Sequence, residues 1–140
     1  MDKSIEKNTI IYLETGSGKT YIAAMLMKEL SKSTEEPYSN GGMRSIFLAP
    51  TVPLVRQQAE YLRTHTSLVL DCYFGEKIID EKILDLWDAK IWEKELEKNQ
   101  ALVMTPKVLV DMIQHSFIGE KFKKIMRIYF PDQFYVFIFF

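Results

Sequence analysis

The stretch "TIIYLETGSGKTYIAAMLMKEL", residues 9 to 30, joins an apolar run to an amphipathic one through a turn rich in glycine. The run from Thr9 to Leu13 is short and β-branched, which is typical of a buried strand. After the turn, apolar residues recur with helical spacing, and one helix face would carry Ile22, Ala23, Leu26, Met27 and Leu30. This strand–turn–helix order predicts the first unit of an α/β fold.

The rest of the chain repeats the alternation of strands and helices. Further strands are predicted at 45–49, 68–74 and 101–104. Further helices are predicted at 50–65, 83–99 and 106–117. Their inward faces would carry Val55, Ala59, Leu62, Leu84, Trp87, Ile91, Val108, Leu109, Met112, Ile113 and Phe117. We therefore expect a mostly parallel sheet with helices on both faces, and a polar surface loop from Ser31 to Arg44.

Composition and charge exclude several function classes. The formal net charge is -1, so the chain lacks the basic footprint of a general polyanion binder. No run approaches the roughly 18 apolar residues that a membrane helix needs. The single cysteine, Cys72, cannot form an internal disulfide, which favours a reducing intracellular setting in the nucleus or cytoplasm.

Five residues draw attention without forming a site pattern. His65 and His115 lack the spacing of metal or nucleophilic sites, and we expect them at surface or satisfied helix positions. Cys72 is expected to be buried in a strand. Trp87 and Trp92 are best explained as core residues of an amphipathic helix, with a partner surface as the alternative.

The glycine turn has the chemistry of a phosphate loop. Gly16 and Gly18 flank Ser17 and allow consecutive backbone N–H groups to surround an anion. The helix beginning near Lys19 adds its positive end, and the Lys19 ammonium would reach the β- and γ-phosphates. Thr20 would place its hydroxyl on Mg²⁺. The alternative is an ordinary strand-to-helix turn with an exposed lysine.

Two Pro/Thr pairs stand where other strands give way to helices. They are Pro50-Thr51 in "FLAPTVPLVRQQAEYL" and Thr105-Pro106 in "ALVMTPKVLVDMI". A threonine hydroxyl and the free N–H groups of a first helical turn can hold a nucleic-acid phosphate without reading sequence. Taken singly, each pair is better explained by helix capping and a turn. Together with the glycine turn, they would meet at one edge of the sheet.

In this order, "TGSGKT", "APTVPLVRQQ" and "VMTPKVLV" are similar to motifs I, Ia and Ic of superfamily 2 helicases. Residues 7 to 118 resemble the helicase region of plant Dicer-like endoribonucleases, including Tyr73-Phe74-Gly75 and Trp87-Asp88-Ala89. The resemblance implies that residues 1–118 are part of a P-loop, RecA-like first lobe. It implies that ATP and Mg²⁺ are bound by Thr15, Gly16, Ser17, Gly18, Lys19 and Thr20. It implies that double-stranded RNA is contacted by Pro50, Thr51, Gly75, Thr105 and Pro106.

Other parts of the family pattern are not found. The family has an Asp-Glu-Cys-His box near Tyr129 to Asp132, where this chain reads "YFPD". The aromatic segment 119–140 is therefore expected to lie outside the family sequence. The second helicase lobe and the ribonuclease III domains are also missing, so we expect an incomplete sheet and no ATP hydrolysis by this chain. There are two alternatives. One is a fragment of another superfamily 2 helicase, such as an RNA sensor or a DNA translocase, and the other is a nucleotide-binding remnant without turnover.

Overall fold

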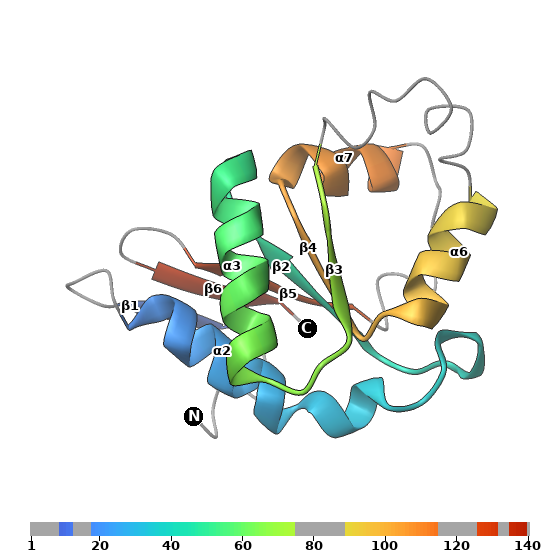
Figure 1. The fold of residues 1–140 in the computed structure, drawn as a ribbon, viewed down its shortest axis with the longest axis horizontal. Coiled ribbons are helices and arrows are strands. Elements are labelled where there is room, and N and C mark those ends of the chain that lie inside the picture. Colours follow the sequence, from blue (N-terminus) through green and yellow to red (C-terminus); the bar gives the residue numbers. More distant parts are fainter. Residues whose placement is uncertain (1–8, 13–17, 75–88, 115–125, 132–134, 140) are drawn as a thin grey trace.

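A computed structural model describes residues 9–12, 18–74, 89–114, 126–131 and 135–139 of the chain (Figure 1). The helices are α2 (Lys19–Glu29), α3 (Val52–His65), α6 (Ala89–Lys98) and α7 (Pro106–Gln114), with short 3₁₀ turns η1 (Ser31–Thr34) and η2 (Tyr38–Asn40). The strands are β1 (Thr9–Tyr12), β2 (Arg44–Leu48), β3 (Leu70–Tyr73), β4 (Ala101–Met104), β5 (Met126–Pro131) and β6 (Tyr135–Phe139).

These six strands form one sheet in the order β1-β6-β5-β2-β4-β3. The four strands β5, β2, β4 and β3 are mutually parallel. The alternation of strands and helices predicted β2, β3 and β4, whereas β5 lies outside the predicted strands. β6 runs antiparallel to both of its neighbours, β1 and β5. Two reversals make β1 parallel to β5, so the carboxyl ends of β1, β5, β2, β4 and β3 share one edge of the sheet.

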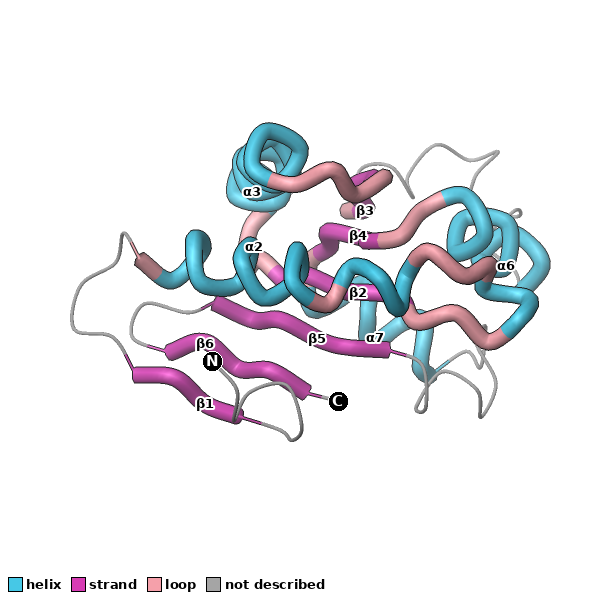
Figure 2. Tube along the Cα trace, turned by 90° about the horizontal axis from the view of Figure 1, so that it is seen from below, coloured by secondary structure: helices cyan, strands magenta, loops and turns pink. Residues whose placement is uncertain are grey.

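Helices cover both faces of the sheet, and each face has its own apolar core (Figures 1 and 2). Side chains alternate along a strand, so Phe47 packs on the face of α2 and α3, while Ile46 and Leu48 pack on that of α6 and α7. The predicted inward positions of α3 (Val55, Ala59, Leu62) are all buried. So are Ala23, Leu26 and Met27 of α2, and Val108, Leu109 and Met112 of α7. The predicted fold class is confirmed.

Several local expectations need correction. Arg44 was assigned to a surface loop but is the first residue of β2, and its side chain is buried. Cys72 lies in β3 as predicted, yet it is half-buried rather than buried. The core assignment of Trp92 is confirmed, because it is buried beside Tyr73. His65 is exposed, as predicted.

Some predicted positions fall outside the described residues. These are Leu84, Trp87, His115 and Phe117. The side chains of Ile91 and Ile113 are also not described. Within the segment 119–140, two stretches form β5 and β6, and Tyr129 of β5 is fully buried. Whether this segment is a separate unit from residues 1–118 stays a prediction.

Candidate nucleotide and nucleic-acid site

The start of α2 carries the second half of the glycine turn. Gly18 has helical dihedral angles, and its carbonyl accepts the first helical hydrogen bond, from the Ile22 amide at 2.9 Å. Lys19 is the first residue of the helix, and its side chain is only 2 % exposed. Thr20 is half-buried beside it. Thr15, Gly16 and Ser17 lie outside the described residues.

The burial of Lys19 bears on the two interpretations of the glycine turn. An ordinary strand-to-helix turn would leave this lysine in solvent, where lysines are found almost without exception. At 2 % exposure the aliphatic stem and the ammonium are held against the protein at the amino end of α2. The amino end of a helix is also where backbone N–H groups and the helix dipole favour an anion. This arrangement fits a phosphate-binding role.

The two Pro/Thr pairs meet because their strands are neighbours. β2 and β4 pair in parallel up to Leu48 and Met104, and one further bond from the Ala49 amide to the Met104 carbonyl, 3.0 Å, continues the pairing. The next residues along each chain segment are therefore Pro50 and Thr105, side by side at the sheet edge. Pro50 and Thr51 are exposed, and Thr105 and Pro106 are half-buried. The predicted convergence of these pairs is confirmed, whereas their contact with RNA is not tested.

Both threonines act at the beginning of a helix. The Thr51 hydroxyl accepts a hydrogen bond from the Leu54 amide at 3.4 Å, and its carbonyl accepts one from Val55 at 2.9 Å. The Thr105 carbonyl accepts from the amides of Val108 at 3.1 Å and Leu109 at 3.4 Å. No acidic residue stands in the first turn of α3 or α7. Thr51 thus caps α3 with its side chain, Thr105 contributes its backbone carbonyl to α7, and neither first turn carries an acidic side chain.

A cation that sequence reasoning did not single out lies at the same edge. The Arg56 guanidinium sits 4.9 Å from the ring centroid of Phe74, the buried residue that follows β3. Gly75, the next residue, lies outside the described part of the chain. The available signal was that Arg56 is one helical turn beyond Val52, the first residue of α3. Such spacing keeps a side chain near the amino end of the helix.

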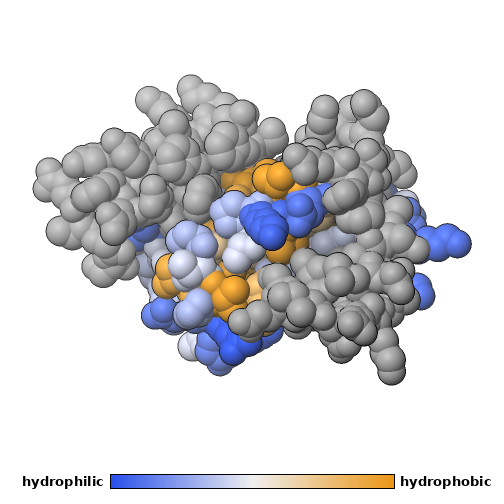
Figure 3. Space-filling model, turned by 90° about the horizontal axis from the view of Figure 1, so that it is seen from above, coloured by the Kyte–Doolittle hydropathy of each residue, from blue (hydrophilic) through white to orange (hydrophobic). Residues whose placement is uncertain are grey.

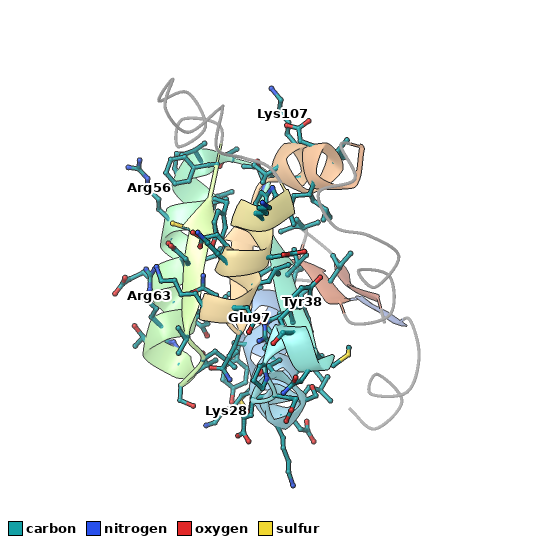
Figure 4. The ribbon with its side chains drawn as sticks, turned by 90° about the vertical axis from the view of Figure 1, so that its right-hand side faces the viewer. Lys28, Tyr38, Arg56, Arg63, Glu97 and Lys107 are labelled. Atoms are coloured by element: carbon teal, nitrogen blue, oxygen red, sulfur yellow. The ribbon has the colours of Figure 1, made fainter. Side chains whose placement is uncertain are left out.

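The sheet edge carries polar and apolar groups together. Figure 3 looks onto this edge and shows hydrophilic and hydrophobic residues side by side in the part of the surface that is described. Figure 4 shows Arg56 of α3 and Lys107 of α7 at this end of the molecule, with Arg63 further along α3 and Lys28 at the opposite end. Both Arg56 and Lys107 are exposed. Two exposed cations therefore stand at this end of a chain whose overall charge is -1.

A buried polar network holds β3 to α6. The Tyr73 hydroxyl donates to Glu95 Oε2 at 2.5 Å, and the Asn99 side-chain amide donates to the Tyr73 oxygen at 3.1 Å. Burial raises the pKa of Tyr73 above its ordinary value, and the bond to Glu95 and its negative charge raise it further. The network fixes the last residue of β3, which leads directly into Phe74 and Gly75.

The residues fit Mg²⁺ only as a companion of a nucleotide. Among the described residues, no three His, Cys, Asp or Glu side chains gather in a way that could hold a metal ion. Thr20 would supply one hydroxyl oxygen, and the remaining oxygen ligands would come from phosphates and water, which is a common arrangement for Mg²⁺. As for membranes, none of the described helices is long and apolar enough to span a bilayer.

Comparisons with known proteins agree with this geometry. The chain is 40% identical over 126 residues to endoribonuclease Dicer homolog 2 of Arabidopsis thaliana, which covers 90% of this chain and 8% of that protein. It is 42% identical over 118 residues to Dicer homolog 1 of the same plant, covering 84% of this chain and 6% of the relative. The chain therefore spans less than a tenth of the length of these relatives.

A solved structure supports the fold. The hypothetical ATP-dependent RNA helicase from Sulfolobus tokodaii aligns with a TM-score of 0.54 at 23% identity, over 83% of this chain and 30% of that one. Its likeness supports the RecA-like sheet, which here is incomplete. The resemblance to plant Dicer-like proteins is confirmed by the identities above. Because the DEAD/DEAH box helicase family model matches residues 2–128, this chain belongs to the DEAD/DEAH box helicase family.

Proposed function

We propose that this chain is a nucleotide-binding segment of a Dicer-like helicase that binds ATP with Mg²⁺ and contacts double-stranded RNA. The observation that carries the proposal is the buried Lys19 at the amino end of α2. Its ammonium would neutralise the β- and γ-phosphates, with the amides of Thr15 to Gly18 around them and the Thr20 hydroxyl on Mg²⁺. Catalysis needs more than this cradle, so binding is the activity assigned to the chain.

The RNA path would cross the sheet edge beside the nucleotide. Pro50 and Thr51 stand next to Thr105 and Pro106 because of the Ala49–Met104 bond, and Gly75 follows the neighbouring strand. The amino ends of α3 and α7 open at this edge and offer N–H groups to backbone phosphates. Such contacts bind any RNA sequence. In a longer Dicer-like protein this edge would help feed double-stranded RNA towards ribonuclease III domains for small-RNA production.

We do not assign ATP hydrolysis to this chain. Attack of water on the γ-phosphate needs an acidic element that holds Mg²⁺ and positions the water. In the family this element has the sequence Asp-Glu-Cys-His, and this chain has Tyr129, Phe130, Pro131 and Asp132 in its place. Asp132 lies outside the described residues, and no water-positioning role is transferred to it.

Calorimetric titration with the non-hydrolysable analogue AMPPNP and Mg²⁺ tests the proposal. The unmodified chain should bind the analogue, and Lys19→Ala should weaken binding by about a hundredfold, since a charge-assisted bond to phosphate is lost. Lys28→Ala is the matched control, because Lys28 is exposed in the last turn of the same helix. Equal affinities of the two variants would contradict the proposed cradle. In a separate assay with ATP, RNA-stimulated phosphate release above the Lys19→Ala background would contradict the absence of hydrolysis.

A further inference from the structure

The strand that leads into the glycine turn is held in the sheet by the last strand of the chain. β1 stands at one edge of the sheet, and its one neighbour among the described strands is β6. β6 pairs with β1 from Thr9–Ile138 to Tyr12–Tyr135. On its other side it pairs with β5, and Phe137 lies opposite both Ile10 and Phe130. β6 therefore connects β1 to the rest of the sheet.

The two ends of the glycine turn are anchored in different ways. At its far end, α2 packs into the core through Leu26 and Met27, in the same cluster as Phe47 and Tyr129. This cluster draws on β2, β5 and α3, so α2 keeps partners other than β6, although it also contacts β6. At its near end, the turn follows Tyr12, the last residue of β1. A phosphate cradle needs both ends fixed, because its N–H groups converge on one anion.

The spacing of strands shows what the loss of β6 would do. Adjacent strands lie about 4.8 Å apart, so β1 stands about 9.6 Å from β5 with β6 between them. No backbone hydrogen bond spans that distance. Without β6, β1 must either leave the sheet or move by about one strand spacing to pair with β5. Either change displaces Tyr12 relative to Lys19, because the helix of Lys19 still packs on β2, β5 and α3.

We propose that β6 is a positioning strand for the nucleotide site: by pairing with β1 on one side and β5 on the other, it sets where the glycine turn begins. This role rests on the proposed binding of ATP. It assigns a task to residues 135–139, a segment that sequence reasoning placed outside the family. The affinity for nucleotide would then depend on β1–β6 pairing, because a cradle that is ordered before binding loses less conformational entropy when the nucleotide binds.

A proline within β6 tests the proposal in the full chain. Phe137→Pro removes an N–H group and restricts the backbone in the middle of a strand with neighbours on both sides. We expect the dissociation constant for AMPPNP with Mg²⁺ to rise at least tenfold. Amides of Ile10 to Tyr12 should lose protection from hydrogen exchange, while those of Ile46 to Leu48 and of β4 keep theirs. Phe137→Val, which preserves a strand-forming residue, should behave like the unmodified chain.

Three results would overturn the role of β6. One is unchanged affinity in Phe137→Pro; the second is unchanged protection of β1 in that variant. The third is an equal loss of protection in β1, β2 and β4, which would make β6 a general stabiliser of the fold. If the unmodified chain binds no AMPPNP, the proposed function fails, but the exchange comparison still decides whether β6 holds β1.

A measurement on the unmodified chain gives an independent answer. If β6 holds β1 in the geometry that binds nucleotide, then saturating AMPPNP must stabilise the β1–β6 pairing in return. Amide exchange of Val136 to Ile138 should therefore slow when nucleotide binds, although β6 itself touches no phosphate in the proposed cradle. If AMPPNP binds but leaves the amide exchange rates of β6 unchanged, the coupling is contradicted.

Discussion

At the residue scale, Thr51 combines a structural contact with a proposed functional one. Its hydroxyl accepts the Leu54 amide at the first turn of α3, and the same side chain is exposed at the edge proposed to hold RNA. At 3.4 Å the cap bond is long, so its contribution lies at the low end of the usual range for caps. Substitutions that keep the cap but change the charge can separate the two roles.

We expect Thr51→Ala to lower the free energy of unfolding by about 0.5–1 kcal/mol and to weaken RNA binding. Thr51→Asp should leave stability within about 0.5 kcal/mol, because aspartate caps helices well, yet weaken RNA binding further through repulsion of the phosphate. Urea denaturation and fluorescence anisotropy with a duplex RNA measure the two effects. If Thr51→Asp binds RNA as tightly as the unmodified chain, this residue is a cap alone.

At the element scale, α3 reaches from the proposed RNA edge towards the opposite side of the molecule, with one exposed arginine near each end (Figure 4). Arg56 lies in its first half, over the Phe74 ring. Arg63 lies in the last turn and forms an exposed ion pair with Glu60, 3.6 Å between Nη1 and Oε2. The two residues have the same charge but different positions, which makes them a matched pair.

Arg56→Ala should weaken duplex RNA binding about three- to tenfold and reduce the slope of log affinity against log salt by about 1, because one phosphate contact is lost. Arg63→Ala should change neither quantity measurably. Anisotropy titrations at several salt concentrations provide both numbers. Equal effects of the two variants would show that RNA does not follow the edge defined by Thr51 and Thr105.

The contact between β3 and α6 makes stability depend on pH in the alkaline range. The unfolded tyrosine ionises near pH 10, and the pKa of Tyr73 is raised in the folded chain by burial and then by Glu95. The folded state thus keeps a proton that the unfolded state releases. Its stabilising contribution is complete below pH 10 and is lost as the pH rises above it.

Tyr73→Phe should therefore make the free energy of unfolding decline less steeply above pH 10. Any contribution of the other tyrosines to this decline remains. At pH 7 the same variant should lose about 1–2 kcal/mol, since Glu95 and Asn99 lose a hydrogen-bond partner. Chemical denaturation at pH 7, 9 and 10.5 measures both effects. An unchanged alkaline slope would show that Tyr73 ionises in the folded chain as easily as in the unfolded one.

At the scale of the whole molecule, the end opposite the proposed site is fastened by a buried arginine. Arg44 donates through Nε to the Leu96 carbonyl at 2.6 Å and through Nη1 to the carbonyls of Met43, Thr34 and Glu36 at 2.7 to 3.1 Å. Burial lowers the pKa of this guanidinium, and the charge of Glu97 opposes the shift. One side chain thus connects β2, η1 and α6.

Arg44→Met should lower the free energy of unfolding by about 2–4 kcal/mol, because four buried carbonyl contacts lose their donor. Arg63→Met, at an exposed position, should stay within about 0.5 kcal/mol. In the folded protein the affinity for AMPPNP should not change, since Arg44 lies at the amino end of β2 and the cradle lies at the other edge. A large loss of AMPPNP affinity under conditions where Arg44→Met is fully folded would indicate coupling between the two ends of the molecule.

Apolar periodicity, the caps and the turn residues of the sequence determined most of the elements and their class. A helix buries the face whose residues recur every three to four positions, so Val55, Ala59 and Leu62 could be placed in the core from spacing alone. The proline and threonine pairs could be placed at one edge, because parallel strands end on the same side. Strand, turn and helix order also identified Gly18, Lys19 and Thr20 as the start of a helix.

The tertiary structure alone decided which strands are neighbours and which polar groups leave solvent. Local sequence carries no record of a partner distant along the chain, so the pairing of β6 with β1 across more than a hundred residues was not visible in it. Arg44 was expected in a loop because it ends a polar stretch of sequence. Its acceptors are carbonyls of three separate segments, which local sequence does not reveal. The sequence predicted a phosphate-binding role for Lys19 but could not determine that the fold would bury its side chain. Pairing and burial are set by contacts between remote segments, and these exist only once the chain has folded.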